Sequence, residues 1–326
     1  MLRKTNVRRE CGVRIVFFGT PAFAAHILNH ILRNSSHKVV AVVSRPDAPS
    51  GRGRHLQPTP VKKAVQEYNE EIPILQPLKA SSPEVAAQLQ TLSPDIFLVV
   101  AYGEILRKNI LEIPSKGCFN IHASLLPEYR GAAPIQRALM NGCSKTGVTF
   151  MRMGEGMDSG DIVVQRSCAV SEKENAGELT EKLLKLSLEL IDDALARIKN
   201  GTAPFTPQQH ALATYAPKIQ PEDLVLNDVD DIWQIHNRVR SLSPAPGAYF
   251  WIQLRGEKKR LKILRTHLDQ TLCDAEHRWK CSSEGYLALC TAEGALVFDE
   301  VQLEGKAAIS SKEFLRGTPL EEVLFL

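Results

Sequence analysis

The sequence predicts an α/β fold in two parts: a Rossmann-like, mostly parallel sheet in an N-terminal domain, and a small C-terminal β-barrel of the OB-like type. In the first part, short apolar runs alternate with segments whose apolar residues recur at helical spacing, which is typical of a parallel sheet covered by helices. In the second part, short apolar runs follow one another between turn residues, which indicates a small barrel. A chain of 326 residues with 44% hydrophobic and 24% charged residues can build two such cores.

The N-terminal domain opens with a well-marked strand and helix. The apolar run Val13 to Phe18 predicts a buried strand, and Gly19-Thr20-Pro21 predicts a helix start with Thr20 as the N-cap. This turn has one glycine where a dinucleotide-binding turn has three, so we expect no NAD. Further strands are expected at residues 39–43, 96–101, 118–122, 147–153 and 162–170, and helices at 83–92 and 177–199.

Turn residues at 200–204 end the last of these helices and set the predicted domain boundaries. A helix near residues 232–239 is expected next, followed by strands at 248–254, 261–265, 286–290 and 295–301. We therefore divide the chain into an N-terminal tail (1–12), a first domain (13–204), a linker (205–221) and a C-terminal β-barrel domain (222–326).

Composition excludes several classes of protein. The net charge is only +3, so any nucleic-acid binding must come from local basic segments. Seven cysteines without a CxxC pair argue against a disulfide framework or a zinc site and favour the cytoplasm. No run approaches the roughly 18 apolar residues of a membrane span. The basic tail lacks the apolar stretch of a signal peptide, which indicates a loose tail or an early start codon, with a short targeting remnant as the alternative.

Asn120-Ile121-His122 ends a predicted strand and is the first candidate for chemistry. Side chains alternate along a strand, so Asn120 and His122 point to the same face, at the edge where parallel sheets bind ligands. An amide can donate to a developing oxyanion and an imidazole can move a proton, so the pair suits acyl transfer. The alternative is a strand end whose polar residues face water.

Two loops complete the candidate site. Residues 124–134 hold two prolines and a glycine directly after His122, and residues 154–162 hold three glycines around Asp158. Glycines allow an irregular backbone that could aim Asp158 into a cleft. Alone, the first loop could be an ordinary strand-to-helix connection and the second a surface hairpin turn.

Together these segments resemble the folate-dependent formyltransferases. The resemblance rests on Cys118-Phe119-Asn120-Ile121-His122-Ala123-Ser124-Leu125-Leu126-Pro127 and on Met157-Asp158-Ser159-Gly160-Asp161. It implies that Asn120, His122 and Asp158 are catalytic. It also implies that the formyl donor is 10-formyltetrahydrofolate, that no metal is needed, and that folate is contacted by Ser124, Leu125, Leu126, Pro127 and Leu106.

An insertion at residues 45–63 narrows the resemblance to the family members that formylate methionyl initiator tRNA. The insertion is rich in glycine and proline, and it carries five basic residues against one acidic residue. A flexible loop of this charge suits phosphate contacts, so the resemblance implies tRNA binding by Arg45, Arg52 and Arg54. Without the resemblance, a solvated loop would be the better reading.

A second basic segment, residues 255–265, lies in the predicted barrel. Here Leu261 and Ile263 can face the core while alternate basic residues face outward, so we expect Lys258, Arg260 and Lys262 to contact tRNA. The alternative is an ordinary solvated hairpin.

Three rival functions remain at this stage, and we expect the protein to be a monomer. Glycinamide ribonucleotide formyltransferase shares the motifs but is a single domain, and sugar-nucleotide formyltransferases have no need of a basic insertion. A catalytically silent tRNA-binding module is the third rival, and the intact Asn120, His122 and Asp158 argue against it.

Overall fold

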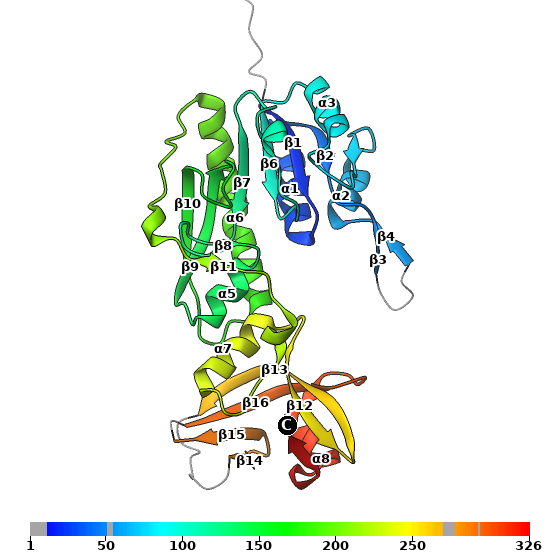
Figure 1. Ribbon diagram of the computed structural model, residues 1–326, viewed down its shortest axis with the longest axis vertical. Helices are drawn as coiled ribbons and strands as arrows, with labels where there is room; N and C mark the ends of the chain where they lie inside the picture. The colour runs from blue at the N-terminus through cyan, green and yellow to red at the C-terminus, as the bar shows by residue number, and fades with distance from the viewer. Residues whose placement is uncertain (1–11, 51–54, 270–277, 293) are drawn as a thin grey trace, which may run out of the picture. The chain divides into compact units, whose positions relative to one another are not determined.

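The computed structural model describes residues 12–50, 55–269, 278–292 and 294–326 (Figure 1). The chain divides into two compact units. The first consists of residues up to Arg130 together with Gly147–Ser167 and Lys182–Thr214. The second consists of Gly131–Thr146, Cys168–Glu181 and Tyr215–Leu326. Across the described helices, none is both long and apolar enough to cross a membrane.

A seven-stranded, mostly parallel sheet forms the centre of the first unit, as the sequence predicts. Its order is β10-β9-β7-β6-β1-β2-β5. The pairs from β5 to β7 are parallel, whereas β7 and β9 are antiparallel, so the sheet is mixed at one side. The strands are β1 (Arg14–Gly19), β2 (Lys38–Val43), β5 (Ile74–Leu75), β6 (Ile96–Val100), β7 (Cys118–His122), β9 (Lys145–Arg152) and β10 (Ile162–Ala169).

Helices bury apolar stripes against this sheet. Every residue of β6 is buried, as expected for a strand covered on both faces. Thr59 and Ser82 cap α2 and α3, each followed by a proline in the first turn. The helices of this unit are α1 (Ala22–Asn34), α2 (Pro60–Tyr68), α3 (Pro83–Thr91), α4 (Lys108–Leu111) and, from Lys182 on, α6 (Ala176–Asn200), whereas α5 (Pro134–Met140) belongs to the second unit.

The N-cap of α1 differs from the prediction. Pro21 occupies that position and makes no side-chain cap. Thr20 Oγ1 instead donates to the carbonyl of Tyr102, 3.0 Å away. The hydroxyl therefore joins the loops that follow β1 and β6 rather than capping the helix, because a long-range acceptor competes with the local backbone donors.

The second unit is an antiparallel sheet with one long helix, α7 (Ile232–Leu242). The predicted C-terminal β domain is confirmed, in the form of a half-barrel. The described strands run as an open path, β14-β15-β16-β13-β12-β18, with β17 paired to β16. The elements are β12 (Ala248–Leu254), β13 (Glu257–Asp269), β14 (Trp279–Cys281), β15 (Leu287–Thr291), β16 (Gly294–Leu303), β17 (Ile309–Ser310), α8 (Ser311–Gly317) and β18 (Val323–Phe325).

Candidate active site

Asn120 and His122 lie at the carboxyl end of β7, next to the antiparallel strand β9. In the register, Asn120 lies opposite Met151 and His122 opposite Thr149. Strand alternation puts Asn120 and His122 on one face while Ile121 is buried on the other. Asn120 is half-buried and His122 is buried. Little water therefore competes for hydrogen bonds to the amide and the imidazole, which lie side by side on this face.

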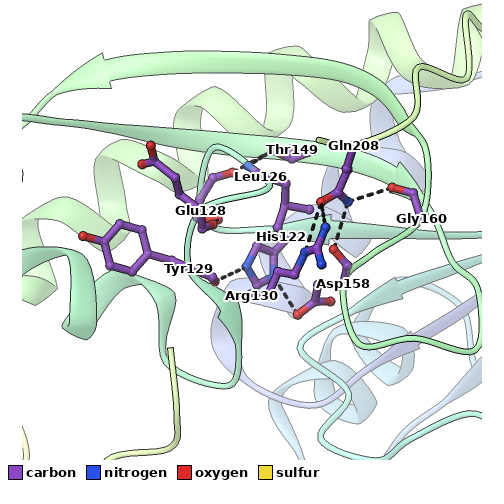
Figure 2. A network of polar contacts seen from close by, with 10 residues as sticks. His122, Leu126, Glu128, Tyr129, Arg130, Thr149, Asp158, Gly160 and Gln208 are labelled. Carbon is purple, nitrogen blue, oxygen red and sulfur yellow. Dashed lines mark hydrogen bonds and ion pairs between the residues drawn. The ribbon is translucent and has the colours of Figure 1, made fainter. Parts of the chain in front are cut away.

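The two ring nitrogens of His122 have different partners (Figure 2). Nε2 lies 2.8 Å from the carbonyl oxygen of Tyr129. A carbonyl can only accept, so Nε2 carries a hydrogen and donates it. Nδ1 lies 3.5 Å from Oδ2 of Asp158. Nδ1 is therefore the nitrogen at which His122 can gain or lose a proton, and it does so beside a carboxylate.

Asp158 comes from the loop that joins β9 to β10. Its φ of +48° lies in the left-handed region, which non-glycine residues seldom adopt. Gly160 lets the loop close, because a Cβ there would lie 1.9 Å from the carbonyl oxygen of Arg152. The side chain of Asp158 is 17% exposed against 6% for His122, so the carboxylate is the more accessible partner of the pair.

The segment predicted to contact folate is tied down through one hydroxyl. Thr149 Oγ1 donates to the carbonyl of Ser124 at 2.7 Å and accepts from the backbone N–H of Leu126 at 3.1 Å and from Gln165 Nε2 at 2.9 Å. Gln165 also donates to the carbonyl of Leu126, 2.9 Å away. The bond between Leu126 and Pro127 is cis. The backbone of this loop is thereby fixed directly after His122.

The side chains of the predicted folate residues are not equally accessible. Leu125 and Pro127 are half-buried, whereas Ser124 and Leu126 are buried. Leu106 is 5% exposed and packs in the apolar cluster beneath the sheet with Tyr102. The structure thus brings Ser124 to Pro127 together with His122 and places Leu106 in the core.

Two functional candidates were missed from the sequence: Arg130 and Gln208. Both are buried, at 4% and 6% exposure. Gln208 Oε1 accepts from Arg130 Nε at 3.1 Å and Nη2 at 2.6 Å, and Gln208 Nε2 donates to the carbonyls of Asp158 and Gly160 (Figure 2). The sequence held one signal for Arg130. It is a charged residue within the loop after His122, and a buried charged residue needs a partner.

Within the described residues, the basic insertion (45–63) contains a small hairpin. Strands β3 (Ala48–Ser50) and β4 (His55–Gln57) pair antiparallel, and Arg52 and Arg54 lie outside the described residues. At the base, Asp47 accepts from Lys62 Nζ and from Gln76 Nε2, both at 2.7 Å. Arg45 is exposed, with Nη1 3.8 Å from Oε2 of Glu104.

In the second unit, the predicted tRNA residues are already engaged within the protein. The Lys258 ammonium lies 4.7 Å from the ring centre of Trp251, and Lys262 donates to the carbonyl of Pro246 at 2.8 Å. Arg260 forms an ion pair with Glu304. Because such pairing lowers the local positive charge, Lys258 and Lys262 are more available to a phosphate than Arg260.

The thiol of Cys118, in the strand that carries Asn120 and His122, is unreactive. Burial raises the pKa of the Cys118 thiol to about 12, so this cysteine in β7 is not a nucleophile at neutral pH. Among the described residues, no three His, Cys, Asp or Glu side chains are grouped to hold a metal ion. An amide, an imidazole with one proton-exchanging nitrogen and an adjacent carboxylate remain, and this set suits acyl transfer to an amine.

Solved structures with the same fold include several formyl transferases. An N-formyltransferase from Helicobacter canadensis, in complex with folinic acid and dTDP-3-aminofucose, superposes with a TM-score of 0.64 at 19% identity, over 88% of this chain and 98% of that one. HypX from Aquifex aeolicus, in complex with tetrahydrofolic acid, gives 0.62 at 16% identity over 93% and 47%. At these identities the likeness concerns the fold alone.

Family models and full-length relatives go further. Residues 13–195 match the formyl transferase family and residues 218–319 match the formyl transferase C-terminal domain. Methionyl-tRNA formyltransferase of Geobacter metallireducens is 42% identical over 310 residues, covering 95% of this chain and 97% of that one. That of Protochlamydia amoebophila is 40% identical over 318 residues, covering 98% and 99%. The chain belongs to the formyl transferase family, and within it to the methionyl-tRNA formyltransferases.

Proposed function

We propose that this enzyme transfers the formyl group of 10-formyltetrahydrofolate to the free amino group of methionyl initiator tRNA. The observation that carries the proposal is identity of about 40% along nearly the whole of both chains to enzymes named methionyl-tRNA formyltransferase. The site supports it, because Asn120, His122 and Asp158 meet at one edge of the sheet with the chemistry that acyl transfer requires.

Asn120 and His122 stabilise the oxyanion in this mechanism. When the amine nitrogen attacks the formyl carbon, negative charge develops on the formyl oxygen. A donor that is already in place, such as the Asn120 amide, stabilises that charge without reorganisation. His122 is the second group that we assign to this oxygen, and it faces the substrate through Nδ1 because its Nε2 is occupied by the Tyr129 carbonyl.

Asp158 and His122 manage the proton. The attacking amine must lose one proton, and N10 of the folate must gain one as its bond to the formyl carbon breaks. The carboxylate of Asp158 orients Nδ1 of His122, or a water molecule beside it. This arrangement helps the proton to move from the amine nitrogen to N10 of the folate. We assign no metal to these steps, because the formyl group is already activated on its carrier.

We assign the binding of the formyl donor, 10-formyltetrahydrofolate, to the loop of residues 124–127. Its backbone is held by Thr149 and Gln165, so Leu125 and Pro127 present a fixed, half-buried surface next to His122. Two solved structures of the same fold are described in complex with tetrahydrofolic acid and with folinic acid, which supports a folate as the formyl donor. We retain Leu106 as a proposed folate contact, made from the apolar cluster in which it is buried.

We assign tRNA recognition to two basic regions. Arg45 and the hairpin that carries Arg52 and Arg54 follow β2, at the same edge of the sheet as His122, and we expect them to meet the acceptor end. Lys258, Arg260 and Lys262 of the second unit are expected to contact phosphates without reading bases.

One assay tests the proposal against its rivals. Purified enzyme and 10-formyltetrahydrofolate are supplied with methionyl initiator tRNA, glycinamide ribonucleotide or an amino-sugar nucleotide, and the formylated product is measured. We expect turnover on the tRNA alone. Turnover on either small amine in preference to the tRNA would refute the proposed acceptor and would leave the family assignment intact.

A further inference from the structure

The two loops that carry the site both hold a non-glycine residue in the left-handed region of backbone space. Tyr129, whose carbonyl binds His122, has a φ of +57°, and Asp158 has a φ of +48°. Such conformations cost free energy and persist only where the surroundings hold them in place. The groups that hold them therefore control where His122 and Asp158 lie.

Besides His122 itself, the buried side chains of Arg130 and Gln208 join the two loops. Arg130 directly follows Tyr129, and its guanidinium donates to Gln208 Oε1 through Nε at 3.1 Å and Nη2 at 2.6 Å. Gln208 Nε2 donates to the carbonyl of Asp158 at 2.9 Å and to that of Gly160 at 2.7 Å (Figure 2). It therefore binds the loop that carries Asp158 on both sides of Ser159.

The geometry leaves the Gln208 amide one orientation. Its oxygen must face the guanidinium, and both of its hydrogens are then used by the two carbonyls. The backbone before it is also fixed, because Thr206 and Ile162 exchange both of their backbone hydrogen bonds, at 2.8 and 2.9 Å. Gln208 thus has both ends of its amide bonded within the protein, and the Arg130 guanidinium is held by Gln208 and by a contact of its Nη2 with Nδ1 of His210 at 3.1 Å.

We infer that Gln208, held by Arg130, is a positioning residue that sets the separation between His122 and Asp158 for formyl transfer. The inference rests on the proposed function. The Nδ1 to Oδ2 distance is 3.5 Å, at the long end of hydrogen bonding, so a small shift of the Asp158 backbone decides whether the contact forms. A displacement of about 1 Å in a catalytic group can cost a factor of about 100 in rate.

Two substitutions separate positioning from simple support of the fold. In Gln208→Glu the side chain still accepts from Arg130 but cannot donate, and it turns an oxygen toward the two carbonyls. In Gln208→Met all of these hydrogen bonds are lost, and the Arg130 guanidinium keeps the contact of its Nη2 with Nδ1 of His210. The exposed neighbour Gln209 supplies the matched control, Gln209→Glu, with the same change of charge.

For Gln208→Glu we expect kcat to fall about 10- to 100-fold, KM for 10-formyltetrahydrofolate to change less than about twofold, and the thermal midpoint to stay near that of the wild type. Gln208→Met should lose both kcat and thermal stability, and Gln209→Glu should match the wild type. In an Asp158→Asn background, Gln208→Glu should add little further loss, because it acts through Asp158.

The inference is overturned if Gln208→Glu keeps kcat within about twofold, if only KM changes, or if the losses at Gln208 and Asp158 multiply as independent effects do. A loss of kcat confined to Gln208→Met would assign Gln208 to the support of Arg130 alone. Should the wild type fail to formylate methionyl initiator tRNA, the proposed function fails separately. The same comparison is then made on hydrolysis of 10-formyltetrahydrofolate, where water replaces the amine at the same site.

Discussion

At His122, hydrogen bonding decides which ring nitrogen takes part in the reaction. Donation from Nε2 to the Tyr129 carbonyl fixes the tautomer and the plane of the ring, and Nδ1 is left for proton exchange beside Asp158. For Asn120, on the same face of β7, we propose the task of donating to the formyl oxygen.

The Asn120→Ala variant tests that task. We expect kcat to fall by about 10² to 10³, the usual cost of removing one oxyanion donor, with little change in KM. Far-UV circular dichroism and the thermal midpoint should match the wild type, because Asn120 is half-buried at a strand end. A variant that retained most of its kcat would remove Asn120 from the oxyanion site.

His236, in α7, is a buried histidine of a different kind. Nδ1 lies 2.8 Å from Thr266 Oγ1, and Nε2 lies 3.0 Å from the carbonyl of Glu172. Desolvation by burial is the main cause that lowers its pKa below the ordinary 6.5. The folded protein therefore holds the neutral ring, whereas the unfolded chain takes up a proton below about pH 6.5.

Acid should therefore destabilise the second unit through His236. The contribution of the neutral ring to stability is present above pH 6.5 and is lost progressively as the pH falls below that value. His236→Gln cannot titrate, so we expect a flatter dependence of the unfolding free energy between about pH 7 and pH 5, together with a loss of about 1–3 kcal/mol at pH 7.5. Equal slopes for variant and wild type would show that other groups cause the acid sensitivity.

How far the site could be read from the sequence depends on how local each contact is. Asn120, His122 and Asp158 stand in short motifs, and strand alternation alone puts the first two on one face. Gln208 is 50 residues from Asp158 and 78 from Arg130, so no spacing rule links them. Its position depends on the pairing of Thr206 with Ile162, which only the fold supplies.

The elements were predicted best where their apolar pattern was long. Buried strands such as β1 and β6 were found because each holds at least four consecutive apolar residues, whereas β13 runs from Glu257 to Asp269 and was predicted only for 261–265. The charged residues of β13 interrupt its apolar pattern, so the sequence does not mark where this strand begins and ends. The hairpin β3–β4 was read as a loop, because strands of three residues are too short to show an alternation.

The base of the β3–β4 hairpin is anchored to α2. Asp47 accepts from Gln76 and from Lys62, and these hydrogen bonds, that of Gln76 first, lower the pKa of Asp47. Gln76 Nε2 also donates to the carbonyl of Arg45 at 2.8 Å. The anchor therefore sets the direction in which the basic insertion leaves the sheet.

Asp47→Asn should loosen the hairpin without touching the catalytic groups. We expect formylation of initiator tRNA to fall roughly two- to fivefold, which is the scale of one partly exposed ion pair. Hydrolysis of 10-formyltetrahydrofolate should be unchanged. Glu112→Gln, which removes the exposed ion pair with Lys108 in the same unit, is the control and should leave both rates unaltered. Parallel losses in both reactions would mean that Asp47 supports the catalytic edge instead.

Across the whole molecule the formal net charge is only +3, so binding of a polyanion depends on local basic regions. Several basic residues of 255–265 are paired with carboxylates: Arg255 with Glu322, Lys259 with Glu257, Arg260 with Glu304 and Arg265 with Glu178. Basic residues counted from the sequence therefore overstate the charge that this face presents. A carboxylate that pairs with one of them should weaken tRNA binding.

Glu304→Gln should strengthen the binding of every tRNA by freeing Arg260. We expect the slope of log Kd against log salt concentration to steepen by roughly 0.7–0.9, the value of one added phosphate contact. Glu284→Gln makes the same change of charge at an exposed position outside these ion pairs, and its slope should match that of the wild type. Identical slopes for Glu304→Gln and the wild type would take Arg260 out of the binding surface.

The division of the chain into two units has a consequence for how this enzyme can change in evolution. The chain passes between the units after Arg130, Thr146, Ser167, Glu181 and Thr214, so α5 and the first turn of α6 belong with the C-terminal sheet. A single crossover between two genes cannot exchange the second unit as a module, because parts of it are encoded within the first half. A hybrid of two relatives would combine α5 of one parent with α7 of the other. Only the exchange of the coding segments of both helices together would restore a pair from one parent.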